Sequence, residues 1–257
     1  MNKIIKIVAV SLIVIFIGGV IYALASSGIK SYQEKKANQT AELSAIKLVD
    51  ATCPNCFKMD SLLDILKKEN VVFKDIKEVD VSSEEGNALI SQHNITKIPI
   101  LIITGDIEKN EPFTKLWEGF GQKKDKTLIS DVFPPYKNLN DSTTIGLVDL
   151  TVIYDSTCTE CYNSKMHDVY LAAEGIYPVN TNKLDASSQE AKDLIAKYNI
   201  KKIPTVILTP EAKYYKNLTE KWVQDGFIAD DGYYIFTAPE KIGTYKDLET
   251  NEIIKNN

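Results

Sequence analysis

The stretch Asp50-Ala51-Thr52-Cys53-Pro54-Asn55-Cys56 returns in altered form as Asp155-Ser156-Thr157-Cys158-Thr159-Glu160-Cys161. The two Cys-x-x-Cys pairs within these stretches contain all four cysteines of the chain. The tripeptide Lys-Ile-Pro follows each pair, and its proline, Pro99 or Pro204, lies 46 residues after the first cysteine. This agreement in spacing indicates that the chain contains the same local structure twice.

The similarity extends well beyond the cysteines, because the two halves align without a gap at a constant offset of 105 residues. The aligned region runs from Asp50 to Gly121 in the first copy and from Asp155 to Gly226 in the second. A unit of this size is typical of a domain, and not of the short periods found in solenoid proteins. The sequence therefore predicts two similar domains in tandem.

Length and composition favour a globular protein that does not bind nucleic acid. A chain of 257 residues is long enough for two domains of ordinary size. Hydrophobic residues make up 44% and charged residues 25% of the chain, and the net charge of −5 would repel phosphate groups. The only two histidines, His93 and His167, do not suggest a metal site, and we expect both on solvated helices without a catalytic role.

The amino-terminal residues 1–25 have the pattern of a transmembrane helix. Lys3 and Lys6 precede an uncharged run over residues 7–29, and about 20 apolar residues are enough to span a bilayer. Lysines in front of such a run favour a cytoplasmic amino terminus. We therefore expect a single-pass cell-membrane protein whose domains lie on the extracytoplasmic side.

A cleaved signal peptide is the alternative for the same segment. Ala23-Leu24-Ala25 fits a cleavage site before Ser26, although the apolar run is longer than the usual core of a signal peptide. Both interpretations predict export of the folded part. Residues 26–44 are polar and are expected to form a tether between the membrane and the first domain.

Each copy alternates short apolar runs with helical patterns in the order β-α-β-α-β-β, so the predicted fold class is α/β. Domain 1 is expected over residues 45–135 and domain 2 over 148–257, joined by a polar linker over 136–147. The ends of the copies are expected to differ. Residues 124–133 predict a closing helix, whereas residues 228–257 predict added strands and turns or a degenerate helix.

The cysteine pairs suit thiol–disulfide exchange. The attacking species is a thiolate, and a cysteine at the start of a helix is stabilised in that form by the helix dipole and by free N–H groups. Cys53 and Cys158 would then attack, while Cys56 and Cys161, one turn later, would resolve the mixed disulfide. A strand, a Cys-x-x-Cys and a helix in succession are the setting that this chemistry requires.

Three other uses of the cysteines remain open. A structural zinc site would place its two pairs about 15–20 residues apart, whereas 101 residues separate Cys56 from Cys158 in sequence. An inert structural disulfide is possible in an exported protein, but a bridge between cysteines three residues apart closes a very short loop and gives little entropic gain. The third alternative is a binding module that retains the motif without its activity.

The chain resembles the thioredoxin superfamily in its Cys-x-x-Cys between strand and helix and in its Ile-Pro segments, over residues 45–135 and 148–227. Two such units in one chain are similar to archaeal and bacterial protein disulfide oxidoreductases, to glutaredoxin-like proteins and, more loosely, to protein disulfide isomerase. The resemblance implies two tandem thioredoxin-like domains with cis bonds before Pro99 and Pro204, close to the cysteines. The backbone of the preceding isoleucines, Ile98 and Ile203, would then pair with an extended client chain.

The chain departs from the superfamily at two positions. Thioredoxin has Trp directly before its first cysteine, where this chain has Thr52 and Thr157. The buried acid of the family, six residues before the first cysteine, falls on Lys47 and Val152. The carboxylates only three residues before the cysteines could serve as substitute proton acceptors or could cap the turn; these are Asp50 and Asp155. Trp117 and Trp222, which occupy equivalent positions in the two copies, are expected in the core of the last strand, away from the site.

The two cysteine pairs are expected to differ in reduction potential. Glu160 lies between the second pair of cysteines, while Pro54 and Asn55 bring no charge to the first. A nearby negative charge destabilises a thiolate, and a less stable reduced form makes a weaker oxidant. The Cys53–Cys56 pair is therefore predicted to be the more oxidising one.

The sequence predicts a membrane-anchored thiol–disulfide oxidoreductase whose catalytic residues are the four cysteines. Its expected partners are client proteins with thiols or disulfides, and a membrane redox partner would fit the proposed location. No metal and no cofactor is expected. A non-catalytic thioredoxin-fold scaffold at the membrane surface is the main alternative, and a cysteine-dependent thiol peroxidase is a lesser one.

Overall fold

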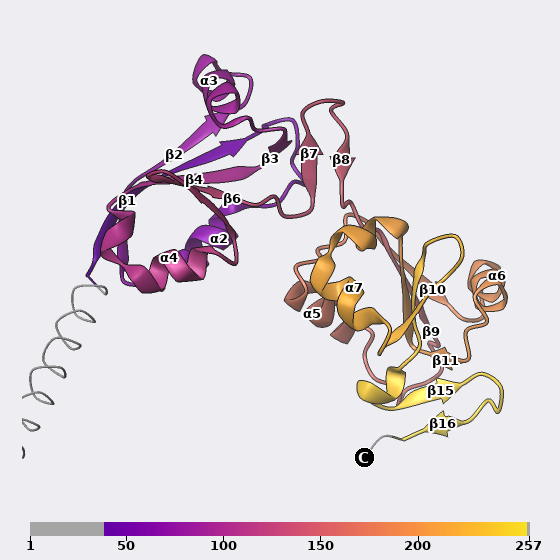
Figure 1. Ribbon diagram of the computed structural model, residues 1–257. Helices are drawn as coiled ribbons and strands as arrows, with labels where there is room; N and C mark the ends of the chain where they lie inside the picture. The colour runs from indigo at the N-terminus through magenta and orange to yellow at the C-terminus, as the bar shows by residue number, and fades with distance from the viewer. Residues whose placement is uncertain (1–38, 256–257) are drawn as a thin grey trace, which may run out of the picture. The chain divides into compact units, whose positions relative to one another are not determined.

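The computed structural model describes residues 39–255 (Figure 1). The predicted membrane segment and residues 26–38 of the predicted tether lie outside the described residues, so both stay predictions. Residues 41–44, which the prediction also places in the tether, instead begin the strand Ala41–Val49, because their backbones pair with neighbouring strands. Between residues 39 and 255, no helix is both long and apolar enough to cross a membrane.

The described residues form two compact units. The first unit contains the residues up to Val49 together with Lys58–Gln92 and Ile100–Asp131. The second unit contains the remainder, including Asp50–Phe57 and His93–Pro99. Both Cys-x-x-Cys turns and both Ile-Pro segments therefore belong to the second unit. The predicted domain limits at 45–135 and 148–257 follow the sequence repeat instead and stay a prediction.

The first unit is built on a five-stranded sheet with the strand order β2-β1-β4-β6-β5. Its first strand pairs in parallel with β2 and antiparallel with β4. The strands are β1 (Ala41–Val49), β2 (Val71–Asp80), β4 (Ile100–Gly105), β5 (Gly121–Lys124) and β6 (Thr127–Ser130). The helices are α2 (Met59–Leu66), α3 (Glu84–His93), the short η1 (Ile107–Lys109) and α4 (Glu111–Trp117).

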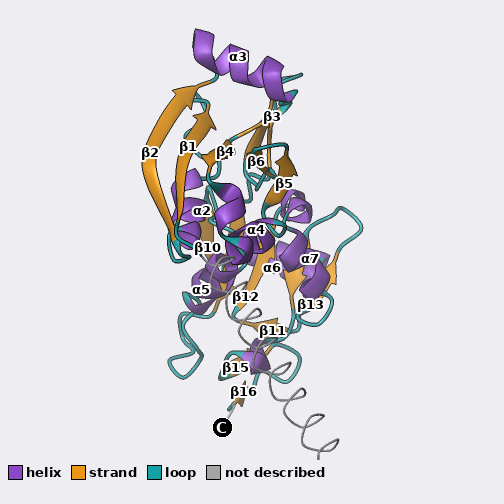
Figure 2. Ribbon diagram, turned by 60° about the vertical axis from the view of Figure 1, so that its left-hand side comes forward, coloured by secondary structure: helices purple, strands orange, loops and turns teal. Residues whose placement is uncertain are grey.

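Helices α2 and α4 lie on the same side of this sheet, and α3 lies beyond the end of β2 (Figure 2). Apolar residues recur with period two over Ala41, Leu43 and Ala45 of β1 and at helical spacing along α2, so the elements bury these faces against one another. The buried side chains include Leu43, Leu48, Leu62, Leu63, Leu66, Phe113 and Trp117. This core holds the strand that leads into the first cysteine pair.

The second unit repeats this sheet with the order β10-β9-β12-β14-β13. Its strand β9, second in this order, is again parallel to one neighbour and antiparallel to the other. The strands are β9 (Leu150–Tyr154), β10 (Thr181–Asp185), β12 (Thr205–Leu208), β13 (Gly226–Ile228) and β14 (Tyr234–Phe236). The helices are α5 (Met166–Ala173), α6 (Gln189–Lys197), η2 (Pro210–Tyr214), α7 (Lys216–Trp222) and η3 (Pro239–Lys241).

Both faces of this second sheet are covered. Successive residues of a strand point to opposite faces, so neighbouring apolar residues of one strand enter two different clusters. On one face Val152 and Phe236 pack in a cluster with Trp222 of α7. On the other face Ile153 and Ile235 pack in a cluster with residues of α6. The continuous apolar runs that the sequence shows here are those expected of strands buried on both sides.

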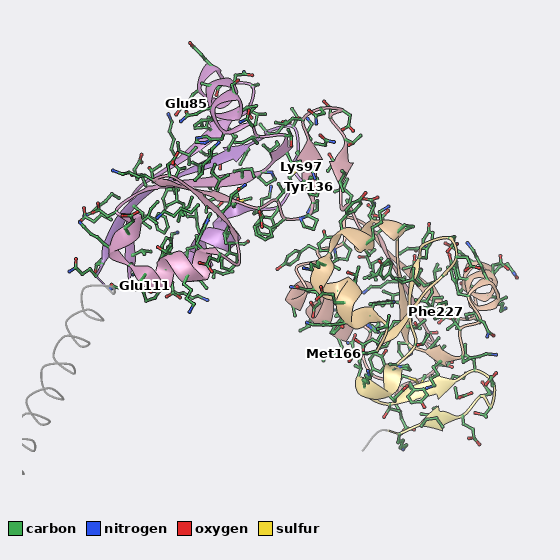
Figure 3. The ribbon with its side chains drawn as sticks, in the orientation of Figure 1. Glu85, Lys97, Glu111, Tyr136, Met166 and Phe227 are labelled. Atoms are coloured by element: carbon green, nitrogen blue, oxygen red, sulfur yellow. A yellow bond between two sulfur atoms is a disulfide. The ribbon has the colours of Figure 1, made fainter. Side chains whose placement is uncertain are left out.

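A small three-stranded sheet accompanies each repeat. In both, the strand that ends in Lys-Ile pairs antiparallel with a strand that begins with Tyr-Lys. Lys97 lies over the ring of Tyr136 at 5.1 Å (Figure 3), and Lys202 lies over Tyr245 at 5.3 Å. The strands are β3 (Lys97–Ile98), β7 (Tyr136–Asn138) and β8 (Thr144–Ile145), and β11 (Lys202–Ile203), β15 (Tyr245–Asp247) and β16 (Ile253–Ile254).

The structure corrects the expected ends of the repeats. The helix predicted over 124–133 is wrong: Asp125, with a φ of 55°, turns the chain between β5 and β6, and the Thr-Leu-Ile-Ser of β6 pairs with β4. The supposed linker over 136–147 contains β7 and β8. Both tryptophans end helices, α4 and α7, and not strands. The two repeats therefore end alike.

Candidate functional site

Each cysteine pair is closed into a disulfide within its own turn. The Cα atoms are 5.4 Å apart in both bridges, and all four cysteines are used. Cys53, Cys56 and Cys158 are 8%, 7% and 9% exposed, while the residues between the cysteines of each pair are exposed. The sulfur atoms thus lie just beneath the surface at the tip of a turn.

The cysteines precede their helices and do not begin them. Helix α2 begins at Met59 and α5 begins at Met166, so the expectation of a first cysteine at a helix start is wrong. Two short turns take the place of that helical turn: in the first repeat, the N–H of Cys53 donates to Asp50 O at 3.0 Å and the N–H of Cys56 donates to Cys53 O at 3.2 Å. Stabilisation of a thiolate by the helix dipole falls off within the first turn, so another source is needed.

An ion pair anchors the turn of the first repeat. Asp50 Oδ1 accepts hydrogen bonds from the N–H and the hydroxyl of Thr52, at 2.7 and 2.6 Å. Asp50 Oδ2 accepts from Lys137 Nζ at 2.6 Å, and both side chains are largely buried, with 9% and 19% exposed. Since Lys137 lies on β7, this pair connects the cysteine turn to the small sheet.

The second repeat has the same anchor. Asp155 Oδ1 accepts from the N–H and the hydroxyl of Thr157, at 2.8 and 2.6 Å, and Oδ2 accepts from Lys246 Nζ at 2.7 Å. The hydrogen bonds from Lys246 and Thr157 lower the pKa of Asp155. For Asp50, burial raises the pKa, but the hydrogen bonds from its lysine and threonine outweigh burial and lower it overall. A carboxylate with a lowered pKa is a weak base, which favours the turn-capping interpretation over that of a substitute proton acceptor.

The peptide bonds before Pro99 and Pro204 are cis, which confirms the conformation that the resemblance implied. The side chains of Ile98 and Ile203 are fully buried, and their backbones pair with Lys137 and with Lys246. Strands β3 and β11 are edge strands of their small sheets, so the sheet continues on only one side of each. The predicted role of these isoleucines in pairing with a client chain stays a prediction.

The first site has a hydroxyl close to the sulfur of Cys53. Thr144 Oγ1 of β8 lies 3.9 Å from Cys53 Sγ. In the small sheet Thr144 is the register partner of Lys137, and the corresponding partner of Lys246 in the other small sheet is Ile253. Thr144 was missed because a linker was predicted there. The repeats Tyr136-Lys137-Asn138-Leu139 and Tyr245-Lys246-Asp247-Leu248 could have revealed it, but they match at an offset of 109 and not 105.

The second site has a hydrogen-bonded pair, a half-buried tyrosine and a buried histidine, that sequence reasoning also missed. Tyr162, the residue after Cys161, donates its hydroxyl to Pro204 O at 2.8 Å, and its oxygen lies 2.9 Å from His167 Nε2. His167 is 1% exposed, so its expected place on a solvated face is wrong. Burial lowers the pKa of His167 to about 4, which keeps the imidazole neutral at physiological pH.

The charge between the second pair of cysteines is partly compensated. Glu160 Oε2 lies 2.5 Å from Lys255 Nζ, with both side chains more than half exposed. An exposed ion pair is weak, yet it reduces the negative potential that the carboxylate exerts on a nearby thiolate. Glu160 alone is therefore a weaker basis for unequal potentials than the sequence suggested. Across residues 39–255, no three His, Cys, Asp or Glu side chains gather closely enough to hold a metal ion.

No family model matches the sequence, and no curated protein matches it. Solved structures that match include the amino-terminal domain of alkylhydroperoxide reductase AhpF from Enterococcus faecalis, at 14% identity and a TM-score of 0.21 over 71% of this chain and 89% of that one. ERdj5 matches at 13% and 0.18, over 71% and 25%, and human ERp44 at 10% and 0.19, over 81% and 93%. TM-scores this low do not establish a shared fold. The likeness to a thioredoxin-like tandem is carried by the two copies of strand, Cys-x-x-Cys turn, helix and cis-proline.

Proposed function

We propose that this chain is a membrane-anchored, extracytoplasmic thiol–disulfide oxidoreductase that exchanges disulfides with client proteins. The observation that supports this most is the repeated site: a disulfide of cysteines three residues apart lies just beneath the surface, and an Asp–Lys pair ties its turn to the strand that pairs with the one preceding a cis-proline. A disulfide in so short a loop adds little stability, so its presence in both copies favours a redox role over a structural one.

The exchange needs only groups that the site and the client supply. In the reduced site, the Cys53 thiolate attacks one sulfur of a client disulfide, forming a mixed disulfide and releasing one client thiolate. Cys56, as a thiolate, then attacks Cys53 Sγ and displaces the second client thiolate. Two electrons pass from the dithiol to the client, whose two thiolates take up the protons that the site has lost. The reverse sequence gives a disulfide to a client, and Cys158 with Cys161 would react in the same way.

The proposed location depends on residues 1–25. An anchor there, preceded by lysines, would hold both sites outside the cytoplasm, where disulfides persist and a membrane redox partner could recycle them. The test is the mass of the mature amino terminus, together with protease treatment of intact cells. A chain that begins at Ser26 would replace the anchor with a signal peptide, and protection of both repeats from protease would contradict export.

The catalytic role is tested by reduction of insulin with dithiothreitol as electron donor. We expect turnover by the wild-type protein and loss of turnover when Cys53 and Cys158 are both replaced by serine. The scaffold alternative predicts no turnover by the wild type, or the same turnover after both replacements. Three of the four cysteines are less than a tenth exposed, so a client could fail to reach them. A folded protein without turnover would therefore favour the scaffold alternative.

A further inference from the structure

Tyr162 is held in place at both ends. Its backbone N–H donates to Thr244 O at 2.8 Å, in the residue just before β15. Its hydroxyl has one proton, which goes to Pro204 O, so the hydroxyl oxygen is left to accept from His167 Nε2–H. Gly243 allows the close fit, because a Cβ there would lie 3.0 Å from Tyr162 Cβ. The side chain therefore joins the second cysteine pair to the carbonyl of the cis-proline.

The histidine behind Tyr162 is packed as a core residue. Its ring lies 4.9 Å from the ring of Phe236 in an edge-on arrangement, and 5.6 Å from the ring of Tyr162. Burial of a polar ring costs free energy unless it is hydrogen-bonded, and replacement of such a pair by apolar groups is often neutral or stabilising. Core stability alone therefore gives no reason for a histidine at this position.

The first repeat shows that an apolar pair is sufficient for the fold. At the offset of 105, Tyr162 corresponds to Phe57 and His167 corresponds to Leu62. Phe57 makes the equivalent backbone bond, from its N–H to Pro135 O at 2.7 Å, and packs on Phe133 at 5.3 Å. A phenylalanine ring has no hydroxyl with which to bind a proline carbonyl. The hydrogen-bonded pair is thus a property of the second site alone.

We infer that Tyr162 and His167 are positioning residues that fix the Pro204 carbonyl beside the second cysteine pair, so that the second site binds the backbone of a peptide client more tightly than the first. This rests on the proposed function. The hydrogen bond to Pro204 O restrains the peptide that directly follows the Lys-Ile strand, and a restrained edge loses less entropy when an extended chain pairs with it. A disulfide too small to reach that edge gains nothing from the restraint.

The test is single-turnover oxidation of the reduced second site in the full chain with Cys53 and Cys56 both replaced by serine. One probe is a ten-residue peptide with one internal disulfide, and the other is 2-hydroxyethyl disulfide. We expect Tyr162→Phe to raise the half-saturating peptide concentration about tenfold, equivalent to about 1.4 kcal/mol, with little change in the limiting rate. The rate constant with 2-hydroxyethyl disulfide should change less than twofold.

Matched variants separate positioning from general damage. Tyr215 is a second buried tyrosine whose hydroxyl donates to a backbone carbonyl, that of Gly146 at 2.9 Å, so Tyr215→Phe should leave the ratio of the two probes unchanged. His167→Leu should weaken peptide binding about threefold, and His167→Gln, which keeps an N–H donor, should restore it.

Three outcomes would overturn the inference. These are equal effects of Tyr162→Phe on both probes, no effect on either probe, or the same change of ratio in Tyr215→Phe. If Tyr162→Phe fails to fold, the comparison of His167→Leu with His167→Gln decides in its place. Equal half-saturating peptide concentrations in these two variants would contradict the inference. A Cys53→Ser/Cys56→Ser protein that reacts with neither probe would instead contradict the proposed function.

Discussion

Acid should destabilise the second unit through His167, and replacement of this residue by leucine should remove that effect. The pKa of His167 is lowered from 6.5 to about 4 by burial, and the unfolded chain has the ordinary value. Between these two pH values the unfolded state binds a proton that the folded state does not. The free energy of unfolding therefore decreases as the pH falls through this interval. The stability that depends on the neutral His167 is fully present only above pH 6.5.

The size of this effect follows from the two pKa values. Protonation linkage with values of 6.5 and about 4 predicts a loss of about 2 kcal/mol between pH 7 and pH 4.5. The aspartates act in a different range. The pKa of Asp185 is lowered by hydrogen bonds from Ser156 and Ser187, and the pKa values of Asp50 and Asp155 are lowered too. The contributions of these three aspartates are complete above about pH 4 and are lost only as the pH falls further, so they change little between pH 7 and pH 4.5.

Urea unfolding measured by tryptophan fluorescence gives the required free energies. The chain has two tryptophans, so a Trp117→Phe background leaves Trp222, which is buried in the core of the second unit, as the reporter. The wild-type loss between pH 7 and pH 4.5 should exceed that of His167→Leu by about 2 kcal/mol. His93→Gln is the control for removing a histidine. Equal losses in the wild type and in His167→Leu would refute the argument.

Three further predictions concern the cysteine turns. Thr144→Val removes a hydroxyl that can stabilise the thiolate of Cys53, so it should raise the pKa of that thiol. Alkylation of Cys53 by iodoacetamide at pH 7 should then slow about threefold to tenfold. An unchanged rate would exclude a stabilising contact between this hydroxyl and the thiolate. Lys137→Met leaves the buried carboxylate of Asp50 without its cation and should cost about 2 kcal/mol in urea unfolding, while a loss below about 0.5 kcal/mol would show that the pair is dispensable. Redox titration of variants with a single functional site should show the first disulfide to be the more oxidising one, and equal or reversed potentials would contradict both Thr144 and Glu160 as causes.

The repeated helices and central strands could be predicted from the sequence because each depends on a local pattern. Helix α3 and the strands β4 and β9 form where the sequence has the helical pattern and the short apolar runs that gave the predicted order β-α-β-α-β-β. The cis bonds at Pro99 and Pro204 followed from a resemblance in residues that are adjacent in sequence. Such features need no knowledge of what lies opposite them in the fold.

The parts that the sequence did not reveal depend on contacts between distant residues. Strands β7 and β8 have three and two residues, too few for a periodic pattern, and exist because β7 pairs with β3 on one side and with β8 on the other. Lys137 reaches Asp50 across 87 positions of the chain. The burial of His167 depends on Tyr162 and on the Pro204 carbonyl, so its neighbours in sequence gave no sign of it.

The ten-residue hairpins Tyr136–Ile145 and Tyr245–Ile254 have equal length, and each meets its cysteine turn through one lysine. The outer strand of the first hairpin brings Thr144 to Cys53, and the corresponding position in the second hairpin holds Ile253. Exchange of these two segments would move Thr144 to the second site and Ile253 to the first while both lysine anchors remain. In this protein, part of the surroundings of each cysteine turn comes from a hairpin that lies more than 80 positions away in sequence.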